Sequence, residues 1–109
     1  LTPETRMMFG ASEFSKMKPT AVLINTARGD LVHTGDLAEA LANETIAGAA
    51  LDVFNSEPLS TKSMLNQLPN VILTPHIASN TNEALIVSLN MVIDNVINVI
   101  NNQDVRWVT

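Results

Sequence analysis

The chain has 109 residues, of which 46% are hydrophobic, and a formal net charge of −5. This length and composition fit one domain with a packed core. There is no cysteine, so disulfides and thiolate metal sites are excluded, and we expect no metal site. The six Lys and Arg residues form no run, so no nucleic-acid partner is expected.

Two helices and one strand are predicted in the first half of the chain. A short helix begins after Gly10, with Glu13 in the capping-box position, and it ends before a proline. Residues 21–26 form a short apolar run that is typical of a strand covered on both faces. Apolar residues at helical spacing predict a second helix over residues 34–43, with Thr34 as its N-cap.

Two further strands and a long helix are predicted in the second half. Residues 45–54 and 71–73 read as strands, and the first of these is rich in small side chains. A long helix over about residues 80–102 begins at Asn80, with Glu83 as a capping partner. This helix is apolar on more than one face, which predicts that it is covered on two sides. The alternation of strands and helices predicts an α/β fold with a three-stranded parallel sheet.

The last helix is also the most apolar segment of the chain. Polar residues interrupt it, so we expect no membrane span, which needs about 18 apolar residues. The N-terminal residues lack the basic start and apolar core of a signal peptide. We therefore expect a cytoplasmic protein.

Charged residues stand where the predicted strands end. Arg28 follows the first strand, Asp52 ends the second, Glu57 lies in the loop after it, and His76 follows the third. Because parallel strands end at one edge of a sheet, and ligands bind there, these residues are expected to converge on a ligand. His33 has no such support and is interpreted as a surface residue.

An Arg, a Glu and a His at one site suit the reduction of a 2-oxo acid. Arg28 would grip the acid and polarise the ketone, His76 would deliver a proton, and Glu57 would keep the imidazole charged. No side chain donates a hydride, so a nicotinamide cofactor is required. Taken singly, Arg28, Glu57 and His76 are each better explained by a solvated or structural role, and Asp52 is equally well explained by a turn or cap role.

Four motifs in order then resemble the D-isomer-specific 2-hydroxyacid dehydrogenases. They are Leu1-Thr2-Pro3-Glu4-Thr5-Arg6, Asn25-Thr26-Ala27-Arg28-Gly29, Ala49-Ala50-Leu51-Asp52-Val53-Phe54 with Glu57-Pro58, and Leu68-Pro69-Asn70-Val71 with Thr74-Pro75-His76-Ile77-Ala78. Met17-Lys18-Pro19 resembles a further family segment. Four ordered motifs are far more specific than one short motif.

The resemblance implies the C-terminal half of a Rossmann-like cofactor domain over residues 1–109, with residues 80–102 as a linking helix. It implies Arg28, Glu57 and His76 as catalytic residues. Its implied cofactor-binding positions are Thr2, Thr26, Ala27, Arg28, Asp52, His76, Ala78 and Ser79. Asp52 would lie near the nicotinamide carboxamide. NAD or NADP is the implied cofactor, and a small 2-oxo or 2-hydroxy acid is the implied substrate.

The family's glycine-rich phosphate turn would precede Leu1. The 109 residues alone are therefore expected to lack activity, because the phosphate-binding helix N-terminus is absent. The strand at residues 21–26 is expected to lack a neighbour, and free strand edges pair with other chains. We therefore expect a homodimer, formed through this edge or through intertwined helices.

Several functions stay open from the sequence. A glyoxylate, hydroxypyruvate or 2-ketoaldonate reductase competes with a phosphoglycerate dehydrogenase, and the ending at residues 106–109 favours the former. Corepressors that share this fold and keep the Arg, Glu and His set are a non-enzymatic alternative. A third alternative is a dimerisation module built on the long helix.

Overall fold

The computed structural model describes residues 1–105, in two compact units, Leu1–Ile77 and Ala78–Thr109. Residues 106–109, whose ending was expected to favour a reductase, lie outside the described residues.

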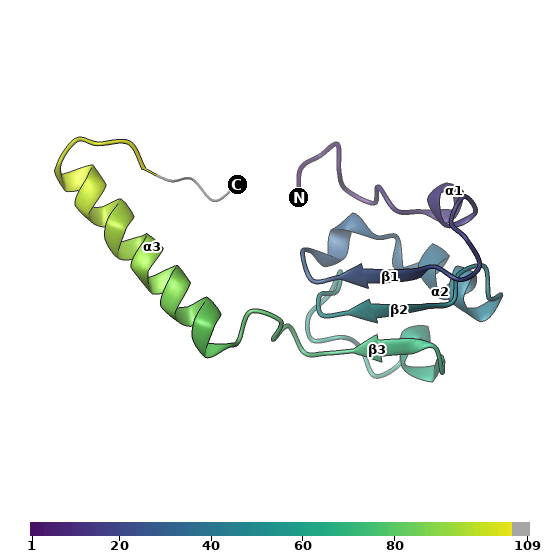
Figure 1. Cartoon of the computed structure of the whole chain (residues 1–109). Helices are drawn as coiled ribbons and strands as arrows, with labels where there is room; N and C mark the ends of the chain where they lie inside the picture. Colours follow the sequence, from purple (N-terminus) through teal and green to yellow (C-terminus); the bar gives the residue numbers. More distant parts are fainter. Residues whose placement is uncertain (106–109) are drawn as a thin grey trace. The chain divides into compact units, whose positions relative to one another are not determined.

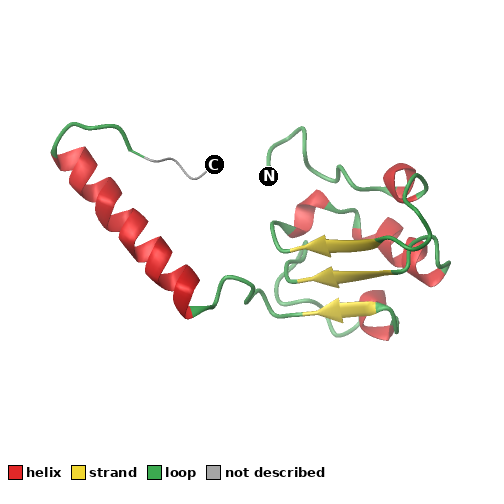
Figure 2. Cartoon of the chain, in the orientation of Figure 1, coloured by secondary structure: helices red, strands yellow, loops and turns green. Residues whose placement is uncertain are grey.

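The first unit is built on a three-stranded parallel sheet. Strands β1 (Val22–Asn25), β2 (Gly48–Leu51) and β3 (Val71–Leu73) lie side by side in the order β1-β2-β3 (Figure 1). All three arrows point the same way in Figure 2, so the three carboxyl ends share one edge. The predicted α/β fold with three parallel strands is confirmed.

Short helices cover one face of this sheet. They are α1 (Ala11–Phe14), η1 (Gly29–Leu31), α2 (Thr34–Ala42) and η2 (Met64–Gln67). The core that they form with the sheet includes five fully buried side chains, Phe14, Leu37, Leu41, Ile46 and Leu65. The apolar residues at helical spacing in α2 pack against alternate strand residues, which gives the first unit its hydrophobic core.

The other face of the sheet is bare among the described residues of the first unit. Val22, Ile24 and Ile72 are 55%, 70% and 68% exposed, and they share this face because strand side chains alternate. The expectation that the first strand is covered on both faces is therefore wrong for the first unit. The opposite face of β1, with Leu23 and Asn25, is buried.

Two helix caps differ from the sequence prediction. His33, rather than Thr34, is the N-cap of α2, because its ring nitrogen accepts a hydrogen bond from the Asp36 backbone. The His33 ring also lies 2.8 Å from the Asp36 carboxylate, so this exposed residue has a structural role. At the start of α3, Thr81 rather than Asn80 accepts the capping bond.

The second unit contains α3, which runs over Asn82–Ile100, inside the expected range of residues 80–102. None of its residues is buried, although a helix apolar on two sides was expected to be covered. By length and composition alone, α3 is apolar enough to cross a membrane, so the expectation that the polar residues rule this out is wrong. The core helices of soluble proteins meet the same criterion.

Candidate active site

The loops after the three strands bring an arginine, a glutamate and a histidine side chain to one cavity. Arg28, Glu57 and His76 all line a cavity of about 210 Å³, together with Leu1, Gly29, Asp30, Val53, Phe54 and Asn55. The predicted meeting of Arg28, Glu57 and His76 is therefore seen in the structure, while their catalytic roles stay predictions. This meeting follows from the parallel sheet, which delivers each loop to the same edge.

Glu57 and His76 form the central pair of this cavity. The Nδ1 atom of His76 lies 2.7 Å from Oε2 of Glu57. The other carboxylate oxygen of Glu57 accepts a hydrogen bond of 3.0 Å from the Phe54 backbone N–H. These two bonds, with that to His76 the stronger cause, hold the pKa of the Glu57 carboxyl below its usual value. An ionised carboxylate thus fixes one ring nitrogen and leaves the other available.

The backbone at His76 is unusual for a side chain of this size. Its φ is 56°, in the left-handed region, which costs a non-glycine residue free energy unless the surroundings enforce it. The enforcing contacts come from Asp52, which is only 3% exposed. Its Oδ1 accepts hydrogen bonds from the Thr74 hydroxyl at 2.6 Å and from the Ile77 backbone at 2.8 Å. Asp52 therefore holds the loop on both sides of His76.

Arg28 comes to the cavity from the loop after β1. The residue is exposed, and its guanidinium Nη1 donates to the Ala27 carbonyl at 2.7 Å. Thr26 and Ala27 are exposed beside it at the edge of the sheet. An exposed guanidinium on the cavity wall can grip a carboxylate with two parallel hydrogen bonds.

Gly29 allows the loops after β1 and β2 to touch. A Cβ atom at this position would lie 2.0 Å from the Phe54 carbonyl carbon and 2.5 Å from the Asn55 nitrogen. No other residue type fits so close an approach of two backbones. This contact brings Arg28 and the segment that holds Glu57 to one cavity.

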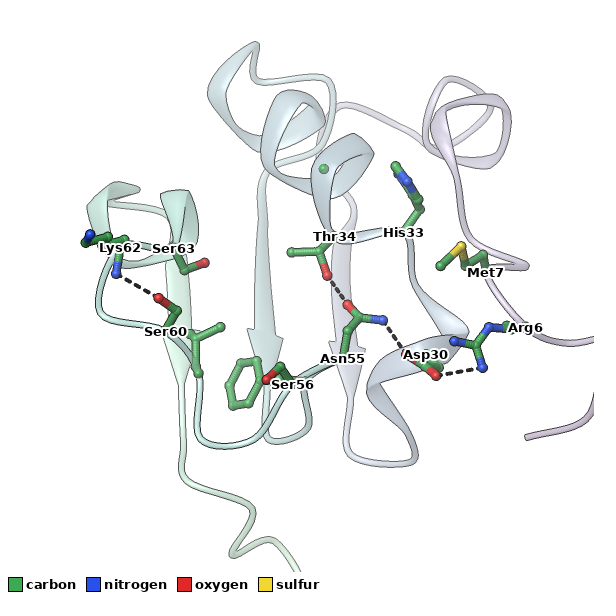
Figure 3. Close-up of a pocket in the computed structure, with 13 residues that line it drawn as sticks. Arg6, Met7, Asp30, His33, Thr34, Asn55, Ser56, Ser60, Lys62 and Ser63 are labelled. Atoms are coloured by element: carbon green, nitrogen blue, oxygen red, sulfur yellow. Dashed lines mark hydrogen bonds and ion pairs between the residues drawn. The ribbon is translucent and has the colours of Figure 1, made fainter.

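Side-chain hydrogen bonds extend that contact, as Figure 3 shows. Nδ2 of Asn55 donates to Asp30 at 2.7 Å, and the Thr34 hydroxyl donates to Oδ1 of Asn55. Asp30 also pairs with Arg6 at 3.0 Å. These residues line a second cavity of about 570 Å³. Asn55 thus connects the loop after β2 with η1 and the start of α2.

The remaining predicted cofactor positions make local contacts of their own. The Thr2 backbone and hydroxyl bond with Thr5 in a turn near the N-terminus. Ala78 and Ser79 open the second unit, where the Ser79 carbonyl accepts a bond from Thr81. Asp52, expected near a carboxamide, uses its Oδ1 for Thr74 and Ile77.

Sequence reasoning missed three residues that build the site, Asn25, Gly29 and Thr74. Asn25 and Thr74 are polar residues at the ends of apolar strands, and that position was the available signal. Gly29 stands directly after the Arg, where a close backbone approach could have been suspected.

A parallel sheet with a hydrogen-bonded histidine–glutamate pair and an arginine at its carboxyl edge is typical of α/β domains, in which ligands bind at the strand ends. Residues 1–78 match the family model described as D-isomer specific 2-hydroxyacid dehydrogenase, NAD binding domain. The chain belongs to the D-isomer specific 2-hydroxyacid dehydrogenase family, and the resemblance of its motifs is confirmed.

Similar proteins extend this finding. A glyoxylate reductase from Aeropyrum pernix is 47% identical over 97 residues, which are 89% of this chain and 29% of that protein. A glycerate dehydrogenase from Methylorubrum extorquens is 46% identical over 98 residues, or 88% of this chain and 31% of the relative. The chain therefore spans under a third of the length of these curated relatives.

Solved structures agree with the fold. An NADPH-dependent glyoxylate/hydroxypyruvate reductase from Sinorhizobium meliloti, in complex with NADP and sulfate, superposes with a TM-score of 0.85 at 32% identity. The match covers 100% of this chain and 35% of that one. A D-isomer specific 2-hydroxyacid dehydrogenase from Xanthobacter autotrophicus, in complex with NADPH and MES, gives a TM-score of 0.85 at 36% identity, covering 96% and 43% of the two chains.

Proposed function

We propose that this chain carries the catalytic loops of an NAD(P)-dependent dehydrogenase that reduces a small 2-oxo acid to its 2-hydroxy acid. The observation that carries the proposal is one cavity lined by Arg28, Glu57 and His76, with Glu57 and His76 2.7 Å apart. Membership of the 2-hydroxyacid dehydrogenase family supports it.

Glyoxylate and hydroxypyruvate are the substrates that we propose. Similar proteins are named glyoxylate reductase, glycerate dehydrogenase and glyoxylate/hydroxypyruvate reductase.

The residues divide the work of the reaction. Arg28 binds the substrate carboxylate and polarises the ketone oxygen, since a guanidinium offers several donors in one plane. His76, as an imidazolium, donates a proton to the carbonyl oxygen as the carbonyl carbon gains a hydride. Glu57 holds the ring by Nδ1, so that Nε2 faces the reaction. The hydride would come from NAD(P)H when it is bound, and the products would be the 2-hydroxy acid and NAD(P)⁺.

The residues fit a nicotinamide cofactor at this edge of the sheet. Thr26 and Ala27 are exposed beside Arg28, directly after β1, where a ligand of a parallel sheet binds. Thr26, Ala27 and Arg28 would hold the cofactor close to the cavity. Solved relatives contain NAD⁺, NADP or NADPH, so either NAD or NADP is proposed.

The test is NAD(P)H oxidation, followed at 340 nm, by the protein that carries these residues. We expect activity with glyoxylate or hydroxypyruvate, and a loss of kcat/KM of about 100-fold or more for His76→Ala, as for a general acid. Arg28→Ala should mainly raise KM for the acid. Lys62→Ala is the control, because Lys62 lines the larger cavity of Figure 3 and not the cavity of Arg28, Glu57 and His76.

Two outcomes would contradict the proposal. One is cofactor binding without turnover of any 2-oxo acid, which would favour a corepressor-like relative. The other is full activity of His76→Ala, which would remove the imidazole from the reaction.

We also propose a cytoplasmic homodimer. The bare sheet face with Val22 and Ile24, and the exposed apolar side chains of α3, support an assembled state because large exposed apolar patches usually lie in interfaces. Light scattering should give twice the monomer mass. A monomer mass across a wide concentration range would contradict the dimer.

A further inference from the structure

The carboxyl edge of the sheet contains a buried polar side chain to which no role has been assigned. Asn25, the last residue of β1, is only 6% exposed. It lies on the core face of the sheet, opposite Leu51 of β2. Burial of an amide costs free energy unless its polar atoms are hydrogen-bonded. The hydrogen bonds of the Asn25 side chain therefore show which part of the structure this buried amide stabilises.

Both ends of the Asn25 amide bind the turn that leads to Arg28. Its Nδ2 donates to the Arg28 carbonyl at 2.8 Å, and its Oδ1 accepts from the Ala27 N–H at 3.1 Å. The Asn25 carbonyl accepts a bond of 3.0 Å from the Asp52 N–H, which ties it to the end of β2. One side chain thus fixes the backbone from Asn25 to Arg28 relative to the sheet.

The same turn orients the guanidinium. The Ala27 residue that Asn25 holds by its N–H offers its carbonyl to Nη1 of Arg28 at 2.7 Å. The Arg28 carbonyl, held by Nδ2 of Asn25, also accepts from Leu31 N at 3.3 Å and so begins η1. A displacement of this turn would therefore move both the backbone and the side chain of Arg28.

We propose that Asn25 is a positioning residue that presents the Arg28 guanidinium to the substrate carboxylate. It touches neither substrate nor cofactor and acts only through the turn at residues 26–28. The inference rests on the proposed function, because it assumes that Arg28 binds the acid. Small displacements of a binding group cost catalysis heavily, by up to about 100-fold for roughly 1 Å.

The experiment measures kcat/KM for glyoxylate or hydroxypyruvate in four single variants and one double variant of the active protein. Asn25→Ala removes both bonds, and we expect kcat/KM to fall by about 10- to 100-fold. Asn25→Ser keeps an oxygen that can accept from Ala27 but cannot reach the Arg28 carbonyl, so it should restore part of the loss. Asn25→Ser also preserves the test if the Ala variant fails to fold.

Asn70→Ala is the matched control. Its Nδ2 also binds backbone carbonyls, those of Leu41 and Ala47, but it stands before β3, at the opposite edge of the sheet. This variant should lose thermal stability without a comparable fall in kcat/KM. Assays are run well below the lower melting temperature, so that both proteins are folded.

A double-mutant cycle with Arg28→Lys separates positioning from general stability. If Asn25 acts through Arg28, Asn25→Ala should add little to the loss already caused by Arg28→Lys. Losses that multiply in full, or an Asn25→Ala protein with normal kcat/KM, would overturn the positioning role and leave the proposed function intact. If Arg28→Lys itself has normal kcat/KM, the proposed function loses its acid-binding residue, and the inference falls with it.

Discussion

Gly29 offers the sharpest test of how the site is assembled. In Gly29→Ala the new Cβ would lie 2.0 Å from the Phe54 carbonyl carbon and 2.2 Å from its oxygen, whereas ordinary contact begins at 3.4 Å. The two backbones must therefore separate by about 1.4 Å, the difference between 3.4 and 2.0 Å. Neither partner is a flexible side chain, so no rotamer change relieves the overlap.

The separation has a cost that can be estimated. Overpacking a rigid contact costs about 3 kcal/mol at the upper end of the usual range. A shift of that size would also stretch the 2.7 Å bond between Asn55 and Asp30, which contributes about 1 kcal/mol. We expect the free energy of unfolding to fall by about 3 kcal/mol or more, and the melting temperature by about 10 °C or more.

Gly35→Ala is the internal comparison. The added Cβ would meet only the His33 ring, at 3.4 Å, and the position lies inside α2. Alanine in place of glycine in a helix gains up to about 1 kcal/mol. None of the described glycines has a left-handed backbone, so the two variants differ mainly in steric contact. Thermal and urea unfolding followed by circular dichroism measure both, and equal stabilities would refute the reasoning.

Two further predictions concern Glu57 and Asp52. In a carbon-13 NMR titration, the Glu57 carboxyl should show a pKa below 4.5, and His76→Ala should raise it. Because the pKa of Glu57 is lowered in the folded state, the pair stabilises the fold above pH 4.5, and this stability is lost as the pH falls through the lowered pKa. A measured Glu57 pKa at or above 4.5 would contradict this prediction. Asp52→Ala should cost about 2 kcal/mol or more in urea unfolding, because it leaves Thr74 and Ile77 without their shared acceptor. Asp52→Asn should cost less, and equal losses would argue against the hydrogen-bond explanation.

The sequence alone predicted the three strands and the meeting of Arg28, Glu57 and His76 at one edge of the sheet. Each strand is a short apolar run, and such a run is recognisable in the sequence even though one face of the sheet is exposed in the first unit. The cavity shared by Arg28, Glu57 and His76 follows from topology, because every loop after a parallel strand leaves the same edge. Neither inference required a side-chain conformation.

The details that the sequence did not predict depend on contacts between distant residues. Gly29 and Phe54 are far apart in the chain, and only the folded sheet brings their backbones together. The cap of α2 moved by one residue to His33, because a cap depends on which side chain reaches the free N–H groups. The role of Asn25 was hidden for the same reason, since its partners are backbone atoms that the sequence does not mark.

The order of the three strands fixes a spacing that loop changes cannot alter. Neighbouring strands lie about 4.8 Å apart, so the ends of β1 and β3 stand about 10 Å apart across β2. The chain reaches Arg28 from one of these ends and His76 from the other. Insertions in the connecting segments would change the residues around a substrate, but Arg28 and His76 would still follow the carboxyl ends of β1 and β3. We therefore expect relatives that bind larger or smaller acids to differ in the side chains between the ends of β1 and β3, and not in the distance between these two ends.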